Sequence, residues 1–429
     1  MNKKYKILSN IDSPNDIRKL NQKDLAILSD EVAMYIHEVI TELGGHYSSP
    51  LGVIELTIAL HYVYNTPEDK IIWDVGHQAY AHKILTGRRK QFSTLRKKDG
   101  ISGFLKRDES KHDIIGAGHS STSISSALGI AHARDYKGDD YDVVSIIGDG
   151  AMTGGLAYEG MNNLGFHRTQ LTIILNDNSK SISDSVGALS GYLNRIITNP
   201  TYNKLRSELW DITGKLPLVS KLLRKFLRKS EEGIKGFLTP GLLFEELGIR
   251  YIGPVDGHDM NEMIHLFKSL KKIKGPVLVH VFTRKGAKSL KAESDSIKYY
   301  SLSGKNNSKA KKGVSYSKIL GNTLIDIADL KPNFKCVTAA MGIGTGIKEF
   351  CDKYNNRYID VGIAEPHAIT YASGLSTEGV IPVVPIYSTF MQRAYDHIMH
   401  DILLQDLPVV LCMDRAGLVG PDGPTHHGI

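Results

Sequence analysis

The sequence predicts two α/β domains, each a mainly parallel sheet covered by helices on both faces. Short apolar runs alternate along the chain with segments whose apolar residues recur every three or four positions. This alternation is typical of parallel strands joined by crossover helices. It pauses near residue 200, stops at a polar stretch near residue 305 and then begins again. A chain of 429 residues accommodates two or three such domains.

The first domain is expected over residues 1–300. Its first helix is predicted over 21–42, where Leu25, Leu28 and Val32 begin a helical apolar pattern. A glycine-rich turn at 44–50 follows, and then a second apolar helix over 51–64. The remaining elements are strands over 71–75, 143–147, 171–175, 248–252 and 276–281, with helices over 123–136 and after Gly155.

Residues 183–240 break this rhythm and include a basic amphipathic stretch at 216–229. We favour a helix that lies over the domain as a mobile cover, with a membrane-surface helix as the alternative. Residues 301–313 are small, polar and basic, which predicts a linker. The second domain is expected over 314–429, with strands over 336–339, 357–361, 380–386 and 408–413.

Composition excludes several classes of protein. The 53 Lys and Arg against 46 Asp and Glu give a net charge of +7, spread along the chain, which does not suggest nucleic-acid binding. No apolar run approaches the roughly 20 residues of a membrane span, and the first residues lack a signal-peptide core. The three cysteines are far apart and have no metal-ligand spacing, so we expect a cytoplasmic protein.

The strongest chemical signal is Gly148-Asp149-Gly150 after one expected strand, paired with Asn178 after the next. Ligands of doubly wound sheets bind at the carboxyl ends of the strands, where Gly150 and Ala151 would let backbone N–H groups approach a diphosphate. Asp149 and Asn178 supply the oxygen ligands that Mg²⁺ prefers. An ordinary turn with an Asp cap is the alternative, but the polar exit at 176–178 favours a site.

A second glycine-rich turn, at 342–346, superficially resembles a dinucleotide-binding loop. It lacks the final glycine spacing, and no acidic residue ends the next strand at the ribose position. We therefore expect it to be a structural turn from strand to helix.

Four histidines in turns, His46, His77, His119 and His426, form another group. A single histidine is more often structural than catalytic, but four in loops after expected helices or strands are harder to assign to a core. Because metal-ligand spacing is absent, we interpret them as proton donors and acid–base groups. Glu365 follows an expected strand, where it either complements a helix dipole or serves a site.

Several longer motifs reveal a resemblance to a known family. They are IIWDVGHQAY at 71–80, HKILTGRR at 82–89, GHSSTSISSALG at 118–129, DVGIAE at 360–365, YSTFMQRAYD at 387–396 and DRAGLVGPDG at 414–423. With GDG and its downstream Asn, they resemble the 1-deoxy-D-xylulose-5-phosphate synthase family of transketolase-like enzymes, which depend on thiamine diphosphate (ThDP). The resemblance implies a diphosphate-binding first domain and a pyrimidine-binding second domain. The second domain is expected to be incomplete at its C-terminus, and a third domain to be missing.

The resemblance also implies roles for individual residues. Mg²⁺ would be held by Asp149, Asn178 and the backbone carbonyl of Lys180. The cofactor would contact His77, Gly118, His119, Ser120, Gly150, Ala151, Asn178, Lys285, Glu365 and Phe390. The substrates would contact His46, Tyr387, Arg415, Asp422 and His426, and the catalytic residues would be Glu365, His46, His426 and Tyr300.

The implied reaction condenses pyruvate with D-glyceraldehyde 3-phosphate to 1-deoxy-D-xylulose 5-phosphate and CO₂, in a cytoplasmic homodimer. This is the first step of the non-mevalonate isoprenoid route, and it also feeds thiamine and pyridoxal synthesis. Two departures concern the mechanism: Tyr300 stands where the family has a histidine, and Pro366 follows Glu365 in place of Gln. The alternatives are ketol transfer of the transketolase type and a ThDP-binding fragment without turnover.

Overall fold

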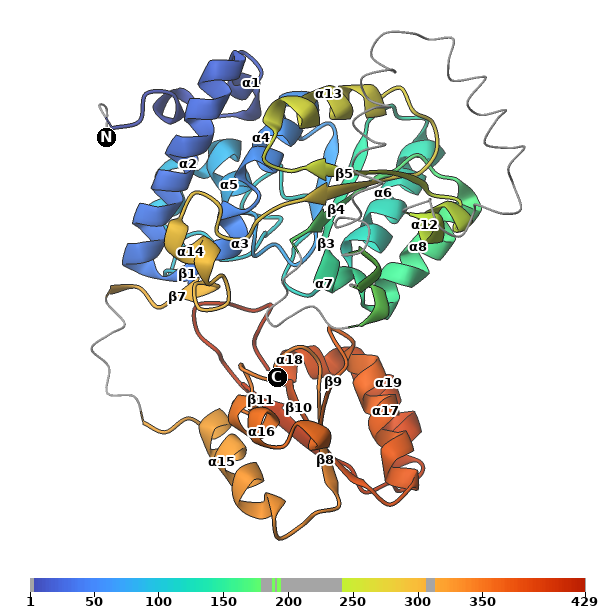
Figure 1. The fold of residues 1–429 in the computed structure, drawn as a ribbon. Coiled ribbons are helices and arrows are strands. Elements are labelled where there is room, and N and C mark those ends of the chain that lie inside the picture. The colour runs from blue at the N-terminus through green and yellow to red at the C-terminus, as the bar shows by residue number, and fades with distance from the viewer. Residues whose placement is uncertain (1–3, 179–186, 190, 194–240, 306–312, 429) are drawn as a thin grey trace.

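The computed structural model describes residues 4–178, 187–189, 191–193, 241–305 and 313–428. Lys180 and nearly all of the predicted insert at 183–240 lie outside these residues. Figure 1 shows two α/β domains, the first coloured blue to yellow and the second orange to red. No helix in the part of the chain described above is both long and apolar enough to cross a membrane.

Five parallel strands form the sheet of the first domain, in the order β2-β3-β4-β6-β5. Their bounds are Lys70–Trp73 (β2), Val143–Gly148 (β3), Thr172–Asp177 (β4), Arg250–Asp256 (β5) and Val277–Phe282 (β6). The short strands β1 (Gly45–His46) and β7 (Ser301–Leu302) form a separate antiparallel pair. The ordered structure of this domain therefore extends two residues into the segment expected to be a linker.

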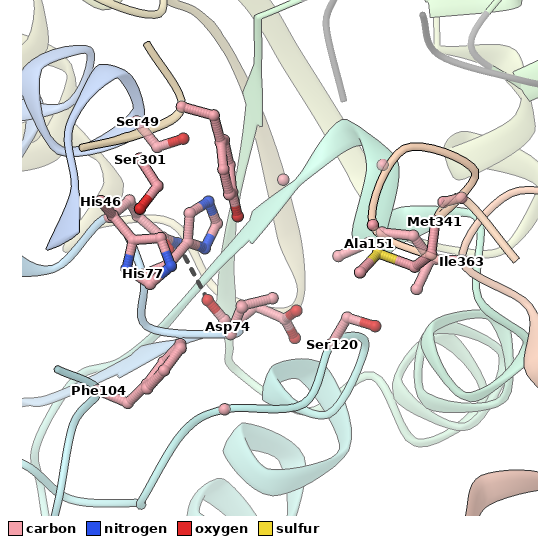
Figure 2. Close-up of a pocket in the computed structure, with 18 of the residues that line it drawn as sticks. His46, Ser49, Asp74, His77, Phe104, Ser120, Ala151, Ser301, Met341 and Ile363 are labelled. Atoms are coloured by element: carbon pink, nitrogen blue, oxygen red, sulfur yellow. Dashed lines mark hydrogen bonds between the residues drawn. The ribbon is translucent and has the colours of Figure 1, made fainter. Parts of the chain in front are cut away.

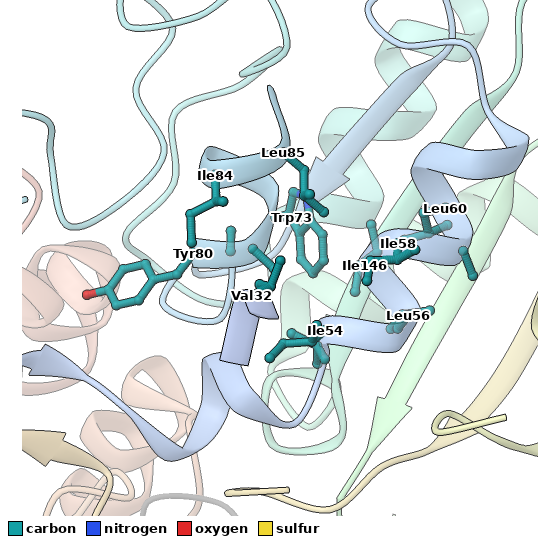
Figure 3. Close-up of a cluster of buried hydrophobic side chains, with 14 of the residues drawn as sticks. Val32, Ile54, Leu56, Ile58, Leu60, Trp73, Tyr80, Ile84, Leu85 and Ile146 are labelled. Carbon is teal, nitrogen blue, oxygen red and sulfur yellow. The ribbon is translucent and has the colours of Figure 1, made fainter. Parts of the chain in front are cut away.

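Helices cover both faces of the sheet, as predicted (Figure 1). On one face, Ile146 of β3 packs with Ile54 and Ile58 of a buried helix, as Figure 3 shows. On the other face, Val143 and Ile147 of the same strand pack in a second cluster. Burying such a side chain contributes about 1.5–3 kcal/mol, so the two clusters hold the strand ends in place.

The helices described in this domain are α1 (Pro14–Ile17), α2 (Gln22–Leu43), α3 (Ser48–Leu51), α4 (Ile54–Val63), α5 (Tyr80–Lys83), α6 (Ser123–Lys137), α7 (Asp149–Met152), α8 (Gly155–His167), α12 (Leu242–Glu246), α13 (Met260–Leu270) and α14 (Leu290–Ser294). The four predicted helices of this domain are present as α2, α4, α6 and α8, and the domain contains further helices that were not predicted. The helix expected over 51–64 begins only at Ile54, because the chain leaves α3 at Gly52. A Cβ on Gly52 would meet the carbonyl oxygen of Arg284 at 2.9 Å, so the close approach of that loop requires glycine here.

The second domain contains four parallel strands in the order β11-β10-β8-β9. The strands are β8 (Phe334–Thr338), β9 (Tyr358–Asp360), β10 (Ile381–Tyr387) and β11 (Val410–Asp414), and the helices are α15 (Tyr316–Ala328), α16 (Lys348–Lys353), α17 (Glu365–Thr377), α18 (Ser388–Met391) and α19 (Tyr395–His397). Val337 of β8 packs with residues of α17, whereas Cys336 packs with residues of α15 and α16. Helices therefore cover both faces of this sheet as well.

The segment after β11 returns to the first domain (Figure 1). The rings of Phe104 and His426 stack with centroids 4.6 Å apart, and Arg96 forms an ion pair with Asp422. A Cβ on Gly118 would meet the Cβ of Thr425 at 2.5 Å. The two domains are thus in direct side-chain contact at the end of the chain.

Candidate active site

The carboxyl ends of both sheets open into one cavity of about 460 Å³. Residues that follow β2, β3, β4 and β6 line it from the first domain, and residues that follow β8, β9, β10 and β11 line it from the second. Ligands of open α/β sheets bind outside the carboxyl ends of the strands. The cavity is therefore positioned as a ligand site shared by the two domains.

One part of the cavity wall carries oxygen ligands and backbone amides. Asp149 begins α7 directly after β3, and Asn178 follows β4, the neighbouring strand in the sheet. Thr283 holds the end of β4, because its hydroxyl donates to Asn176 Oδ1 at 2.7 Å and its N–H donates to the Asp177 carbonyl at 2.8 Å. The space beside Gly148 is open, since a Cβ there would meet nothing within 4 Å.

The described residues contain no group of three His, Cys, Asp or Glu side chains able to hold a metal ion. A cation beside Asp149 and Asn178 would therefore need further oxygen ligands, of the kind a bound diphosphate supplies.

Asp74, at the end of β2, fixes the loop that carries Ser120. Its carboxylate accepts hydrogen bonds from the backbone N–H groups of Ser121 at 2.7 Å and Ser123 at 2.9 Å. Ser121 adopts a positive φ of 68°, which is uncommon for a residue other than glycine. Its hydroxyl donates to the Ala151 carbonyl at 2.7 Å. These bonds tie the residues that follow Ser120 to Asp74 and to α7, and Ser120 itself lines the cavity.

A cluster of rings lines another part of the cavity, where Figure 2 shows His46, His77 and Phe104. The ring of His46 lies 5.7 Å from His77, 5.6 Å from Tyr300 and 5.3 Å from Phe104. Burial lowers the pKa of His46 well below its ordinary value. Burial and the nearby Lys285 ammonium lower the pKa of His77 to about 3. Burial also raises the pKa of Tyr300, although its ring borders the cavity. Near pH 7 this cluster therefore consists of two neutral imidazoles and a protonated phenol.

Arg96 and Arg415 place positive charge near His426. The guanidinium of Arg415 lies over the Tyr387 ring at 3.9 Å, and Arg96 is paired with Asp422. Burial lowers the pKa of His426 to about 4, opposed by Asp422 and assisted by the two arginines. Two guanidinium groups beside a neutral imidazole suit an anionic group such as a phosphate.

Glu365, the first residue of α17, presents a buried carboxyl group to the cavity. Within the described residues, its Oε2 atom has no hydrogen-bond partner. Arg393 Nη1 lies 3.3 Å from Oε2 and donates instead to the hydroxyl of Ser120 at 2.9 Å. Burial raises the pKa of Glu365 and the Arg393 charge opposes that rise. A buried carboxyl group with an unpartnered oxygen fits a hydrogen bond to a nitrogen of a heterocyclic ligand.

Comparison with known proteins identifies the family of the chain. A family model described as 1-deoxy-D-xylulose-5-phosphate synthase matches residues 8–283, and one described as transketolase, pyrimidine binding domain, matches residues 312–429. The chain belongs to the 1-deoxy-D-xylulose-5-phosphate synthase family. The family's enzymes are transferases, and its relation to transketolase implies thiamine diphosphate as the cofactor.

Curated relatives share the family name. The 1-deoxy-D-xylulose-5-phosphate synthase of Syntrophus aciditrophicus is 50% identical over 431 residues, covering 99% of this chain and 66% of that protein. Its counterpart in Carboxydothermus hydrogenoformans is 51% identical over 429 residues, covering 99% and 69%. The chain thus spans about two thirds of the length of these relatives. A solved transketolase from Campylobacter jejuni aligns with a TM-score of 0.48 at 15% identity, covering 95% of this chain and 72% of that one.

Most of the residues that resemblance to the family implied do line the shared cavity. They are His46, His77, Gly118, Ser120, Asp149, Gly150, Ala151, Asn178, Lys285, Tyr300, Glu365, Tyr387, Phe390, Arg415, Asp422 and His426. His119 is not part of the lining, but its ring packs against Phe390 at 5.0 Å and its Nε2 donates to the Thr425 carbonyl at 3.0 Å. Lys180, the remaining expected ligand, is not among the described residues.

The sequence alone did not indicate several members of the site. Arg96 and Phe104 stand in no pattern that predicts a function. Arg393 is visible only as part of the YSTFMQRAYD motif. Gln78, which also lines the cavity, is visible only as part of the VGHQAY motif. The turn at 342–346 joins β8 to α16, as expected, and its Ile343 and Gly344 also line the cavity, which was not expected. Its place at the carboxyl end of β8 was the signal that could have identified it.

Proposed function

We propose that this chain binds ThDP with Mg²⁺ and condenses pyruvate with D-glyceraldehyde 3-phosphate, releasing CO₂ and forming 1-deoxy-D-xylulose 5-phosphate. One observation carries the proposal: a single cavity brings the polar strand ends at Asp149 and Asn178 together with the buried carboxyl of Glu365. These groups lie in different domains and match the two ends of an extended cofactor. ThDP, when bound, supplies the carbon nucleophile and the electron sink that decarboxylation of a 2-oxo acid requires.

The two domains would hold opposite ends of the cofactor. Asp149 and Asn178 would ligate Mg²⁺, and the backbone at Gly150 and Ala151 would approach the diphosphate. Lys285 would add a positive charge at the same end. At the other end, Glu365 would hold a proton at the aminopyrimidine nitrogen, and Phe390 would pack on the ring. The unpartnered Oε2 of Glu365 and its raised pKa support this role.

The cluster of His46, His77 and Tyr300 would serve the substrate carbonyl groups. The neutral imidazoles can accept a proton, and the protonated phenol can donate a hydrogen bond as charge develops on oxygen. Nδ1 of His77 is buried and has no hydrogen-bond partner in the described part of the chain, so it is open to a ligand. The phosphate of the aldehyde substrate would bind near Arg96 and Arg415, with His426 and Tyr387 beside it.

Product analysis tests the proposal. The chain, with ThDP and Mg²⁺, is incubated with pyruvate and D-glyceraldehyde 3-phosphate, and both CO₂ and the sugar phosphate are measured. CO₂ in step with 1-deoxy-D-xylulose 5-phosphate is the expected result. Ketol transfer from a ketose phosphate without CO₂ would indicate a transketolase instead. ThDP binding without either product would indicate a binding fragment, and a version extended to the length of the relatives then shows whether the part that this chain does not cover supplies turnover. The mass of the chain under native conditions tests the proposed homodimer.

A further inference from the structure

The loop that carries Lys285 borders two different cavities. The loop joins β6 to α14, and Lys285 lines the shared cavity. A second cavity of about 430 Å³ borders the loop at Lys288, and its lining also includes Glu55 and His258. None of these three residues lines the first cavity.

Glu55 is the centre of this second group of residues. It lies in the first turn of α4 and is only 5% exposed. Its Oε1 accepts a hydrogen bond from the Ser29 hydroxyl at 2.9 Å and forms an ion pair with the Lys288 ammonium group at 3.0 Å. Its Oε2 lies 3.3 Å from His258 Nδ1. Burial would raise the pKa of Glu55, but the contacts to His258 and Lys288 outweigh burial and lower it to about 2.

His258 relays this contact to the backbone of the loop. The Arg284 N–H donates to His258 Nε2 at 3.0 Å, so that nitrogen carries a lone pair. Nδ1 must then carry the ring proton, which it donates to Glu55. A chain of hydrogen bonds therefore runs from the Glu55 carboxylate through one imidazole to the residue immediately before Lys285.

The loop is also held on both sides of Lys285. The Gly286 N–H donates to the Ser48 carbonyl at 2.7 Å. Lys288 adopts a positive φ of 66°, and its ammonium group pairs with Asp30 at 2.6 Å as well as with Glu55. A non-glycine residue in this conformation needs such support from its surroundings. The structure thus fixes the backbone at positions 284, 286 and 288.

We infer that Glu55 and His258 are positioning residues for Lys285, holding its ammonium group at the anionic end of the bound cofactor. The inference rests on the proposed function, in which Lys285 meets the diphosphate. Both carboxylate oxygens of Glu55 already have partners within the cluster, so the group is built to hold a loop. The ion pair to Lys288 and the hydrogen bond through His258 act on the loop from opposite sides of Lys285.

The test compares Glu55→Gln with Lys285→Ala and the double variant. Glu55→Gln keeps the shape of the side chain but removes the charge and one of the two acceptors. We expect it to weaken ThDP binding about tenfold by calorimetry and to speed hydrogen exchange in a peptide spanning residues 283–289. The substitution should also change the rate at which an amine-reactive reagent labels Lys285. Mass spectrometry measures this rate in the absence of cofactor. Asp69→Asn is the matched control. Asp69 is also a buried carboxylate paired with a lysine, Lys271 at 3.2 Å, but it lies away from the loop.

The outcomes separate the two proposals. If Glu55 acts through Lys285, the losses of affinity in the two single variants will not add in the double variant. Additive losses, or a Glu55→Gln effect no larger than that of Asp69→Asn on all three measurements, would overturn the inference alone. If Lys285→Ala leaves ThDP affinity unchanged, the assigned role of Lys285 in the proposed function is wrong. The positioning inference then falls with it, even where exchange in the loop responds.

Discussion

Arg393 Nη1 lies 3.3 Å from Glu365 Oε2 and 2.9 Å from Ser120 Oγ, which links the second domain to the first. The guanidinium faces a buried carboxyl group, whose pKa burial raises and the Arg393 charge lowers. Because the guanidinium makes no hydrogen bond to Oε2, it opposes the rise in the pKa of Glu365 through its charge alone. That oxygen is left open to a ligand. The role and the pKa of the Glu365 carboxyl group can therefore be tested by substitution.

Replacing Glu365 by Gln should separate binding from reactivity. ThDP should still bind, but exchange of its C2 proton should slow by about 10²–10⁴-fold, because the proton-holding carboxyl is lost. Nuclear magnetic resonance after acid quench measures this exchange. The exposed Glu378, at the end of the same helix, provides the control Glu378→Gln. Unchanged exchange in Glu365→Gln would assign the role to another residue.

The same substitution should stabilise the ligand-free protein at pH 7. The folded state raises the pKa of Glu365, so folding favours its neutral form, and stability is lost as the pH rises from the ordinary pKa through the raised one. A neutral amide removes this cost. Thermal unfolding of Glu365→Gln at pH 7 should show a higher Tm than the unsubstituted chain, and the difference should shrink as the pH falls. A lower Tm at pH 7 would contradict this account.

Asp149→Ala should abolish measurable ThDP affinity in the presence of Mg²⁺. The substitution removes the anionic oxygen ligand at the end of β3 while leaving the strand itself apolar and buried. We expect at least a hundredfold loss of affinity by calorimetry, because Mg²⁺ binding tolerates the loss of a carboxylate ligand poorly. Asp139→Ala, at an exposed position before β3, is the control. Near-normal binding by Asp149→Ala would exclude Asp149 as a ligand.

Tyr300 should act as a hydrogen-bond donor. Its pKa is raised by burial, so it cannot exchange protons near pH 7 but can donate toward the space it shares with His46 and His77. Tyr300→Phe should therefore reduce turnover about tenfold or more, while Tyr300→His should be tolerated or faster. Turnover is measured on protein of the length of the relatives, with Tyr299→Phe as the neighbouring control. If Tyr300→Phe is silent, the hydroxyl has no part in the mechanism.

Acid should destabilise the first domain through its buried histidines. Burial lowers the pKa of His46, His61, His77 and His112, the last two to about 3 and about 4. In the unfolded chain each would bind a proton below about pH 6.5, so unfolding takes up protons and stability falls as the pH drops from 6.5 toward 4. We expect uptake of about four protons near pH 5.5, from urea unfolding at a series of pH values. His112→Asn should remove about one of them, whereas His265→Asn, at an exposed position, should remove none.

The strands of the two parallel sheets and the helices α2, α4, α6 and α8 could be predicted from the sequence because each has a local cause. The run Val143–Ile147 is apolar throughout, since a parallel strand is buried on both faces, and residues from 123 to 136 carry a helical pattern. Asp149 and Asn178 could be predicted for the same reason, because polar residues directly after such strands fall at one edge of the sheet. These signals do not require knowledge of any distant contact.

The remaining members of the site depend on contacts between distant residues. Arg96 acquires its place from Asp422, and Phe104 from His426, each more than 300 positions later in the chain. No local spacing distinguishes such residues from ordinary surface arginines or core aromatics. In its local sequence, Glu55 is only an acidic residue in the first turn of a helix. Its importance follows from His258, which the fold brings beside it.

The shared cavity has a consequence for synthesis of the protein on the ribosome. The described part of the first domain ends at residue 305, whereas the opposite wall comes from residues 339–426. At about 5–20 residues per second, translation of that later part takes roughly 6–25 s, during which the first domain can already fold. Phe104 then lacks the ring of His426 that stacks on it in the folded protein. A cofactor molecule reaching the nascent chain would meet only the wall that carries Asp149 and Asn178, so its retention must wait until the residues up to His426 have left the ribosome.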